Sequence, residues 1–334
     1  MKITVLGAGS WGIALLDLLV ENGHKVVIWE IDGKRAKNLN DSRKIRYFET
    51  DVIVDLPKEI NITNSLDSVK YSEGVLFAVP SHCMRSTCLL LKGEGISLNG
   101  KLIISATKGI ENKTFLRMSE VIENVFPGIY DNIAVISGPS HAEEVCRKVL
   151  TVVISASQNF DTAEKCRKLF MNDYFKVYIQ SDIIGVEIGA ALKNVFAIAA
   201  GIVDGLKYGD NTKAAVVSRG LKELVKIGVI LGGKEQTFYG LSGLGDLMVT
   251  CFSRHSRNRS VGQYIGEGKS FEEAQKSLGM IVAEGIKNTA SAYELGKKFN
   301  IELPIVNEIY HVLFKNKNPI DAVNDSMKMD ARQE

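Results

Sequence analysis

One lysine stands where a charge is costly. Lys193 lies near the middle of VEIGAALKNVFAIAAGIVDG (186–205), whose apolar and small residues predict a buried helix. An ammonium in such a helix must be paired, must face a cleft, or must release its proton readily, because burial disfavours charge. A lysine in that state is a candidate for acid–base chemistry. The alternative is a side chain that reaches the surface and pairs with Glu187 or Asp204.

Two further charged side chains stand at turns that can carry them to the same site. Lys108 ends the predicted strand KLIISATKG (101–109), and Asp246 follows a glycine-rich turn in YGLSGLGDLMVTC (239–251). A carboxylate beside an ammonium fixes its orientation and favours its protonated form. Lys108 and Asp246 are therefore candidate active-site residues in addition to Lys193, although a turn lysine can equally be a solvated one.

A basic loop supplies groups that suit a phosphate. The stretch CFSRHSRNRSVG (251–262) holds three arginines and small polar residues between them: Arg254, Ser256, Arg257, Asn258 and Arg259. A guanidinium donates two parallel hydrogen bonds to a phosphate, and Ser and Asn supply further donors. The loop therefore predicts a site for a phosphorylated ligand; the alternative is a solvated basic loop.

The chain opens with a pattern typical of a dinucleotide-binding turn. The apolar strand ITVL is followed by Gly7, Gly9 and Gly12, in the spacing G-x-G-x-x-G, and then by the helical pattern IALLDLLVEN. The first glycine permits a tight turn, the second lets the backbone approach a pyrophosphate, and the third lets the helix pack on the sheet. The helix N-terminus then faces the phosphates. The pattern predicts binding of a nicotinamide dinucleotide.

The second predicted strand, KVVIW, ends at acidic residues that bear on the choice of cofactor. Glu30 can accept hydrogen bonds from the 2′-hydroxyl of an adenine ribose and would repel a 2′-phosphate, which favours NAD(H). Lys34 and Arg35 follow closely and leave NADP(H) possible. Glu30 as a solvated strand end is the alternative.

The rest of the first half alternates strands with helices. Further strands are predicted at 74–80, 101–109, 133–140, 150–157 and 175–180. This order is typical of the α/β class and predicts an N-terminal Rossmann domain with a doubly wound parallel sheet. Such sheets bind ligands at the carboxyl ends of their strands, where SGPSHAEEV (137–145) places Gly138 and Ser140. An ordinary helix cap is the alternative for Ser140.

After about residue 181 the strand pattern disappears and helical periodicity continues to the end of the chain. Start and stop signals bound several helices; Asp210, for example, opens one that ends at Gly232. The sequence therefore predicts two domains. Residues 1–180 form a dinucleotide-binding Rossmann domain, and residues 181–330 form an all-helical, substrate-binding C-terminal domain.

Composition excludes several classes of protein. Of 334 residues, 45% are apolar and 24% are charged, and the net charge of +2 gives no basis for nucleic acid binding. The five cysteines include no CxxC pair and the five histidines show no metal-ligand spacing, so we expect neither disulfides nor a metal site. The opening MKITVLGAG does not resemble a secretion signal, and charged residues interrupt the apolar stretch near 183–203. We therefore expect a cytoplasmic protein without a membrane span.

Together these motifs resemble one family. GAGSWG, TKG, SGPS, GAALKNVFAIAAGIVDGL, GLGDLMVTC and SRNR occur in the order and at the separations found in bacterial NAD(P)-dependent glycerol-3-phosphate dehydrogenase. The similarity extends from residue 1 to about residue 315. It implies reversible conversion of dihydroxyacetone phosphate to sn-glycerol 3-phosphate, which supplies phospholipid synthesis, and it implies a homodimer.

The resemblance also implies roles for individual positions. Lys193 matches the residue that transfers the proton, and Lys108 matches its active-site partner. The implied cofactor contacts, besides the glycine turn and Glu30, are Ser10, Trp11, Lys108, Ala142, Arg257, Val282 and Glu284. The implied substrate contacts are Lys108, Gly138, Ser140, Lys193, Asn194, Asp246, Ser256, Arg257 and Asn258.

The chain departs from the family pattern in three places. WEID (29–32) stands where many bacterial members have an arginine just after the tryptophan, which argues against NADP use. YFET (47–50) replaces YLPG, so no contact is assigned to Tyr47. His255 stands where an apolar residue is more common, and nothing in the sequence explains it.

Two other functions fit part of the pattern. A 3-hydroxyacid dehydrogenase or a ketopantoate-type reductase has the same architecture, and arginines bind carboxylates too. A nucleotide-sensing module without turnover needs only the glycine fingerprint, and the presence of Lys193, Lys108 and Asp246 argues against it. The combination of GLGDL with SRNR favours the glycerol-3-phosphate dehydrogenase over both.

Overall fold

The chain divides into two units. The computed structural model describes residues 1–46, 53–56, 60–279 and 283–327. The first unit comprises Met1–Glu111 and Leu116–Glu187, and the second comprises Asn112–Phe115 and Ile188–Glu334.

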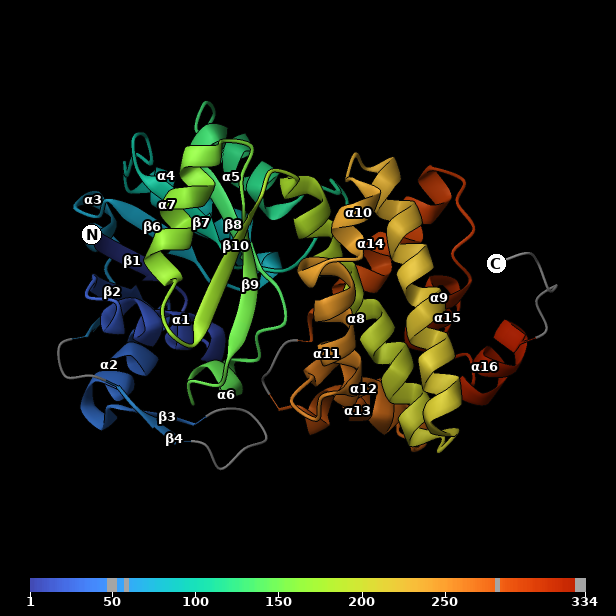
Figure 1. Cartoon of the computed structure of the whole chain (residues 1–334). Coiled ribbons are helices and arrows are strands. Elements are labelled where there is room, and N and C mark those ends of the chain that lie inside the picture. The colour runs from blue at the N-terminus through green and yellow to red at the C-terminus, as the bar shows by residue number, and fades with distance from the viewer. Residues whose placement is uncertain (47–52, 57–59, 280–282, 328–334) are drawn as a thin grey trace. The chain divides into compact units, whose positions relative to one another are not determined.

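The first unit is built on an eight-stranded sheet with the order β10-β9-β8-β7-β6-β1-β2-β5 (Figure 1). Its strands are β1 (Lys2–Leu6), β2 (Lys25–Trp29), β5 (Asn61–Thr63), β6 (Gly74–Phe77), β7 (Leu102–Ser105), β8 (Ile133–Ser137), β9 (Thr151–Ala156) and β10 (Phe175–Gln180). A separate antiparallel pair joins β3 (Lys44–Arg46) to β4 (Ile53–Asp55). The central strands are short runs rich in Val and Ile, as expected for a sheet covered on both faces.

Most neighbouring strands run parallel, as predicted. Leu6 at the end of β1 is level with Trp29 of β2 and with Phe77 of β6, so these carboxyl ends meet at one edge. The pair β8 and β9 is antiparallel, and β10 is parallel to β9, so the last two strands run against the others. A parallel crossover usually needs a long helix, whereas the link from β8 to β9 contains only α6 (Ala142–Val145). The predicted doubly wound sheet is confirmed, with this end reversed.

Helices pack on both faces of the sheet. Besides α6, the first unit contains α1 (Ser10–Glu21), α2 (Gly33–Ser42), α3 (Asp67–Lys70), α4 (Met84–Gly93), α5 (Met118–Val125) and α7 (Phe160–Phe170), with short turns η1 (Ser81–Cys83) and η2 (Tyr130–Asn132). One apolar core contains Leu15 of α1 and Phe170 of α7. The other contains Leu91 of α4 and Ile122 of α5. Each core buries one apolar face of the helices against the sheet, which stabilises the layered fold.

The described residues of the second unit form helices and no strand, as predicted. The elements are α8 (Ile183–Gly205), which begins in the first unit, α9 (Gly209–Ile230), α10 (Glu235–Phe238), the π-turn η3 (Leu241–Gly245), α11 (Asp246–Phe252), α12 (Arg257–Gly266), α13 (Phe271–Ser277), α14 (Glu284–Lys298), α15 (Pro304–Lys315) and α16 (Pro319–Met327). Helix α8 is long and apolar enough to cross a membrane, but 94% of its most apolar stretch is buried inside the protein. It is a core helix, as the charges within it predicted.

Helices α8 and α12 approach each other through paired glycines. Gly201 and Gly205 lie one turn apart on α8, and Gly262 and Gly266 lie one turn apart on α12. A Cβ atom on Gly201 would overlap a backbone carbonyl oxygen of Arg259, and one on Gly262 would overlap a carbonyl oxygen of α8. The two backbones are therefore in contact, and only glycine fits between them.

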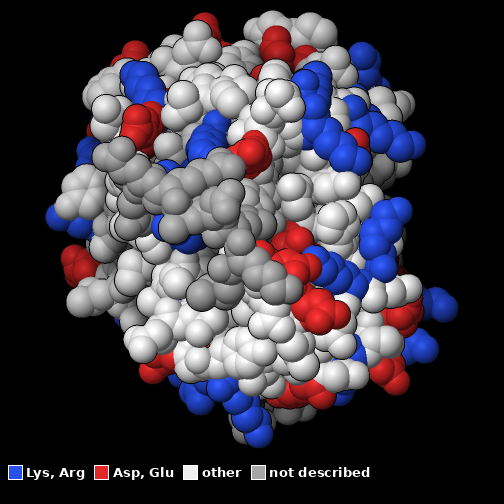
Figure 2. All heavy atoms as spheres, turned by 90° about the vertical axis from the view of Figure 1, so that its right-hand side faces the viewer, with Lys and Arg blue, Asp and Glu red and all other residues white. Residues whose placement is uncertain are grey.

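The surface carries charges of both signs. On the described part of the face drawn in Figure 2, basic and acidic side chains are interspersed among uncharged residues. This distribution agrees with the net charge of +2. A surface of one sign large enough to attract nucleic acid is not present on this part of that face.

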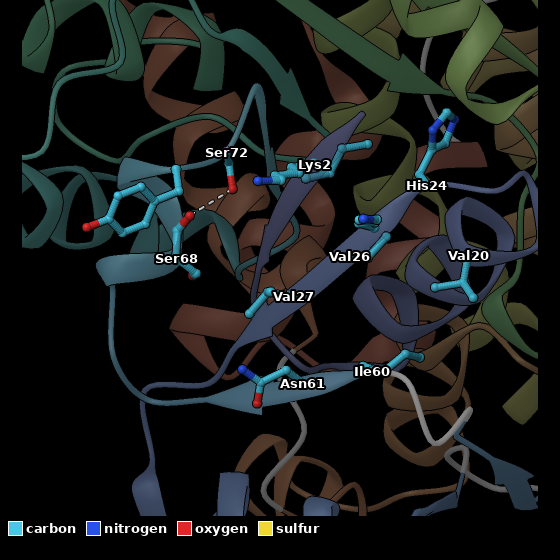
Figure 3. Close-up of a pocket in the computed structure, with 12 residues that line it drawn as sticks. Lys2, Val20, His24, Val26, Val27, Ile60, Asn61, Ser68 and Ser72 are labelled. Carbon is cyan, nitrogen blue, oxygen red and sulfur yellow. Dashed lines mark hydrogen bonds between the residues drawn. The ribbon is translucent and has the colours of Figure 1, made fainter.

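A hollow of about 480 Å³ lies at the amino-terminal ends of β1, β2 and β5 (Figure 3). Lys2 and Asn61 line it, as do Ser68 and Ser72, and Figure 3 shows Ser72 directed toward the backbone of Ser68. The Ser72 hydroxyl donates a hydrogen bond to the backbone oxygen of Ser68 (2.9 Å). Sheets of this kind bind nucleotides at the carboxyl ends of their strands, so this hollow is at the wrong edge for the cofactor.

Glu223 of α9 is a buried carboxyl group that caps another helix. Its two oxygens accept hydrogen bonds from the backbone N–H groups of Ile305 (2.8 Å) and Val306 (3.1 Å), in the first turn of α15. Burial raises the pKa of Glu223 from 4.5 to about 7, and the two hydrogen bonds act in the opposite direction. The folded protein therefore holds a proton that the unfolded chain has already released at pH 6.

We expect this group to make the protein less stable as the pH rises from about 5 to 8. The folded state binds more protons than the unfolded state in this window, so the free energy of unfolding falls by up to about 3 kcal/mol. Thermal unfolding of the wild type and of Glu223→Gln at both pH values measures the effect. The wild type should lose Tm relative to the variant at the higher pH; an unchanged difference contradicts the prediction.

Candidate active site

The glycine turn between β1 and α1 has the backbone that the sequence predicted. Gly7 has a φ of 110°, and a Cβ atom there would lie 2.8 Å from the backbone oxygen of Ala78. A Cβ atom on Gly12 would overlap the carbonyl oxygen of Gly7, so α1 can begin this close to the turn only with glycine. A Cβ atom on Gly9, in contrast, would have nothing within 4 Å. In dinucleotide-binding turns of this spacing the pyrophosphate approaches the backbone at the second glycine, and the open space at Gly9 suits that approach.

The start of α1 leaves polar groups available to a ligand. Gly9 is the N-cap and has no side chain to bond the first N–H groups of the helix, which begins at Ser10. Such N–H groups and the helix dipole favour an anion. Among the described residues, the indole Nε1 of Trp11 is buried without a hydrogen-bond partner. These observations fit a bound dinucleotide at the turn.

Glu30 lies just after β2 and is buried. Its backbone N–H donates to the carbonyl oxygen of Thr63 (2.9 Å), which continues the sheet hydrogen bonding past the strand. Its Oε1 accepts from the backbone N–H of Asp32 (3.1 Å), and its Oε2 accepts from Arg35 Nη1 (2.8 Å). Glu30 is therefore not the solvated strand end of the alternative interpretation, since only 5% of the residue is exposed.

Lys108, Gly138 and Ser140 lie together beyond the carboxyl ends of β7 and β8. Lys108 Nζ donates to the carbonyl oxygen of Gly138 (3.2 Å), and Ser140 Oγ donates to the same oxygen (2.9 Å). Gly138 has a φ of 146°, and a Cβ atom there would lie 2.9 Å from the Cα of Val153. Ala142, the first residue of α6, follows closely and is buried. The structure thus brings these four predicted residues into one part of the first unit.

Lys193 is held by two groups on α11. Its Nζ donates to Asp246 Oδ1 and to Thr250 Oγ1 (2.8 Å), and the Thr250 hydroxyl donates to the backbone oxygen of Asp246 (2.6 Å). Lys193 and Asp246 are 6% and 1% exposed. A buried carboxylate stabilises the protonated ammonium, and the two acceptors fix its direction. The arrangement can present a proton to one defined point.

The surface pairing considered for Lys193 is wrong, because both carboxylates have other partners. Glu187 Oε2 accepts from Arg117 Nη1 (2.5 Å) in a buried ion pair. Asp204 accepts from Lys213 Nζ (2.8 Å) and from Arg259 Nε (2.6 Å).

Thr250 is a site residue that the sequence interpretation missed. It follows Asp246 by one helical turn on α11, and residues spaced in this way lie on the same face of a helix. The spacing D-L-M-V-T in GLGDLMVTC was therefore the available signal.

Gly189, one helical turn before Lys193 on α8, has a packing role. A Cβ atom on Gly189 would lie 2.8 Å from the backbone oxygen of Ser242, so the glycine lets α8 pack against the π-turn η3. This contact brings α8 close to the segment that leads into Asp246. The small residue thus contributes to placing the ion pair.

The arginines of the basic loop divide into two groups. Arg259 is bound to Asp204, as described above, and is partly buried. Arg254 and Arg257 are exposed, and no described residue pairs with either guanidinium. Ser256 is the N-cap of α12; its Oγ accepts from the backbone N–H of Arg259 (3.2 Å). Arg257, at the first position of a helix N-terminus, is the member placed to bind an anion.

Asn258 connects two other predicted residues. Its Nδ2 donates to Asn194 Oδ1 (2.9 Å), and its Oδ1 accepts from the backbone N–H of Gly285 (2.8 Å). Asn194 follows Lys193 on α8, and Gly285 follows Glu284, the first residue of α14. One amide therefore ties α12 to both helices.

Two positions fall outside the described residues, and one has no assigned role. Val282 and Tyr47 are not among the residues that the structure describes. His255 donates its backbone N–H to Ser253 Oγ (3.1 Å), which does not explain the choice of histidine. Across residues 1–46, 53–56, 60–279 and 283–327, no group of three His, Cys, Asp or Glu side chains is placed to hold a metal ion.

Known proteins resemble this chain along its whole length. Two family models match: NAD-dependent glycerol-3-phosphate dehydrogenase N-terminus over residues 2–163, and the C-terminus of the same family over residues 182–324. Glycerol-3-phosphate dehydrogenases (NAD(P)+) from Fusobacterium nucleatum and from Thermoanaerobacter sp. are 45% and 46% identical to it, over 100% of this chain and 98% and 99% of their own lengths. The crystal structure of glycerol-3-phosphate dehydrogenase from Coxiella burnetii has a TM-score of 0.91 and 34% identity, over 98% of each chain.

Proposed function

The chain belongs to the family of NAD(P)-dependent glycerol-3-phosphate dehydrogenases, and from this premise we propose that Lys193 moves the proton in its reaction. The reaction interconverts dihydroxyacetone phosphate and glycerol 3-phosphate, a precursor of phospholipids. The observation that supports the proposal is the buried ammonium of Lys193, held by Asp246 and Thr250.

The proposed step uses groups of α8 and α11. When bound, the cofactor supplies a hydride to the carbonyl carbon, and negative charge then develops on the carbonyl oxygen. Lys193 donates one proton to that oxygen, which becomes the hydroxyl of glycerol 3-phosphate, and the lysine is left as a neutral amine. The carboxylate of Asp246 and the hydroxyl of Thr250 keep Nζ in place. In the oxidative direction the amine takes the proton back.

We propose that residues 1–180 bind the cofactor and that residues 181–330 bind the substrate. The proposed cofactor contacts are Gly7, Gly9, Ser10, Trp11, Gly12, Glu30, Lys108, Ala142, Arg257, Val282 and Glu284. The open space at Gly9 and the uncapped start of α1 support the first of these. The proposed substrate contacts are Lys108, Gly138, Ser140, Lys193, Asn194, Asp246, Ser256, Arg257 and Asn258. Lys108 serves both ligands and acts with Lys193 and Asp246 in catalysis.

We propose that the enzyme prefers NAD(H) to NADP(H). Glu30 Oε1 accepts a hydrogen bond from a backbone N–H and can accept another from a ribose 2′-hydroxyl. The test is oxidation of NADH and of NADPH by the purified chain, with dihydroxyacetone phosphate and with unphosphorylated dihydroxyacetone. Turnover confined to the phosphorylated ketone, and faster with NADH, supports the proposals. Equal turnover of both ketones would contradict the proposed phosphate site. Faster turnover with NADPH than with NADH would contradict the proposed cofactor preference.

Replacing Arg257 by Ala should mainly weaken substrate binding. A guanidinium bonded to a phosphate contributes about 1.5–3 kcal/mol, so we expect KM for dihydroxyacetone phosphate to rise roughly tenfold to a hundredfold, with kcat changed only a few-fold. The matched control is Arg254→Ala, which removes the same charge from the same exposed loop and should change KM little. A loss of NADH affinity with an unchanged KM for the ketone would show that Arg257 does not bind the substrate phosphate.

We also propose that the enzyme works as a homodimer in the cytoplasm. All five cysteines are free thiols, which suits a reducing compartment. Sedimentation equilibrium of the purified chain tests the dimer, and a monomer at micromolar concentration contradicts it.

A further inference from the structure

We propose that Arg35 decides whether a cofactor with a 2′-phosphate is accepted. The inference rests on the proposed cofactor site, because it requires Glu30 to lie beside the adenine ribose. It goes further in naming one residue that sets how strongly the enzyme discriminates between NAD(H) and NADP(H).

Arg35 bridges the end of β2 and the glycine turn. Its Nη1 donates to Glu30 Oε2 (2.8 Å), and its Nη2 donates to the carbonyl oxygen of Ala8 (2.7 Å), between the first two glycines of the fingerprint. Asp32 caps α2 by accepting from the backbone N–H groups of Lys34 (2.9 Å) and Arg35 (3.3 Å). The cap fixes the first turn of α2, from which the Arg35 side chain extends. The hydrogen bonds from Nη1 and Nη2 then hold the guanidinium in place.

The two partners differ in how much of them a ligand can reach. The side chain of Glu30 is 7% exposed, whereas that of Arg35 is 47% exposed. A guanidinium has five N–H donors, and the two bonds to Glu30 and Ala8 use two of them. Arg35 therefore stays bonded to the carboxylate and still offers donors on its exposed part.

This pair changes what Glu30 does to a 2′-phosphate. An isolated carboxylate repels a phosphate, but Glu30 and Arg35 together carry no net charge. The planar guanidinium can also donate paired hydrogen bonds to phosphate oxygens. A ribose 2′-hydroxyl needs only an acceptor, which Glu30 provides. Each type of cofactor thus uses a different member of the pair, and loss of Arg35 penalises only the phosphorylated one.

The test measures binding of cofactor fragments, so it does not depend on activity. Adenosine 5′-monophosphate and adenosine 2′,5′-bisphosphate are titrated into the full chain by calorimetry, for the wild type, Arg35→Gln and Lys34→Gln. We expect Arg35→Gln to weaken the bisphosphate roughly tenfold to a hundredfold and the monophosphate no more than about threefold. Lys34 is an exposed cation one residue earlier in the same turn, so Lys34→Gln controls for the loss of one charge without the contact.

Four results would overturn the inference. Equal weakening of both fragments by Arg35→Gln means that Arg35 only supports the glycine turn. Equal effects of Lys34→Gln and Arg35→Gln on the bisphosphate mean that general charge, and not the bridging guanidinium, attracts it. If neither fragment competes with NADH for the wild-type chain, both the proposed cofactor site and the inference are contradicted. If the fragments do compete and Arg35→Gln binds the bisphosphate as tightly as the wild type does, only the inference is contradicted.

Discussion

Replacing Lys193 by Gln is expected to lower kcat for dihydroxyacetone phosphate on the order of a thousandfold, while NADH binding stays within about threefold of the wild type. The variant lacks the proton that Lys193 would give to the developing alkoxide, and it lacks the positive charge that stabilises that alkoxide. The proposed NADH contacts at the glycine turn belong to the first unit, whereas Lys193 belongs to the second. The measurement is kcat by NADH oxidation together with NADH affinity by fluorescence.

The variant leaves Asp246 buried without a cation, so its stability must be measured too. Gln keeps an amide N–H that can donate to the carboxylate, which limits this problem. Lys213→Gln is the matched control, because Lys213 is also 6% exposed and is also paired with a carboxylate, that of Asp204. It should lose stability but keep kcat within a few-fold. Full turnover by Lys193→Gln, or an equal loss of kcat in both variants, would falsify the assignment.

The second large effect is expected at the glycine contact between α8 and α12. Replacing Gly201 by Ala places a Cβ atom on the backbone carbonyl group of Arg259, and neither helix backbone can move without disturbing its packing. Overpacking of this kind destabilises proteins by about 1–3 kcal/mol, so we expect a fall in Tm of roughly 2–10 °C. Gly262→Ala should act similarly, since it meets the backbone of α8 from the other side.

Gly93→Ala is the control for this pair. Gly93 is the last residue of α4, and a Cβ atom there has nothing within 4 Å. Alanine is the better helix former, so this variant should keep or slightly raise the Tm. A Tm for Gly201→Ala within a degree of the wild type would show that the two helices are not in backbone contact in solution.

The parts of the site that were predicted from the sequence depend on short-range patterns. The turn at Gly7, Gly9 and Gly12 could be predicted because strand, turn and helix follow one another within a few residues. The burial of Lys193 followed from the apolar composition of its own helix. The helical second half was predicted for the same reason.

The parts that periodicity could not predict depend on contacts between distant segments. Periodicity cannot say which of three carboxylates a lysine meets: Asp246 was assigned through the family resemblance, and the structure shows Glu187 and Asp204 taken by cations from other helices and loops. The reversal of β9 against β8 is equally a matter of the connection and not of strand composition. Thr250 was missed because its hydroxyl gains a role only once α11 lies beside α8.

The link between Asn258 and Asn194 depends on one atom, the amide nitrogen Nδ2 of Asn258. The amide donates to Asn194 and accepts from Gly285, and a carboxylate of the same shape has only acceptors. Spontaneous deamidation of Asn258 to Asp would therefore turn the link to Asn194 into a repulsion between two oxygen atoms, at the residue that follows Lys193. If a purified sample loses activity during storage while it stays folded, deamidation of Asn258 accounts for the loss. It is detected as a mass increase of about one dalton in the peptide that contains Asn258.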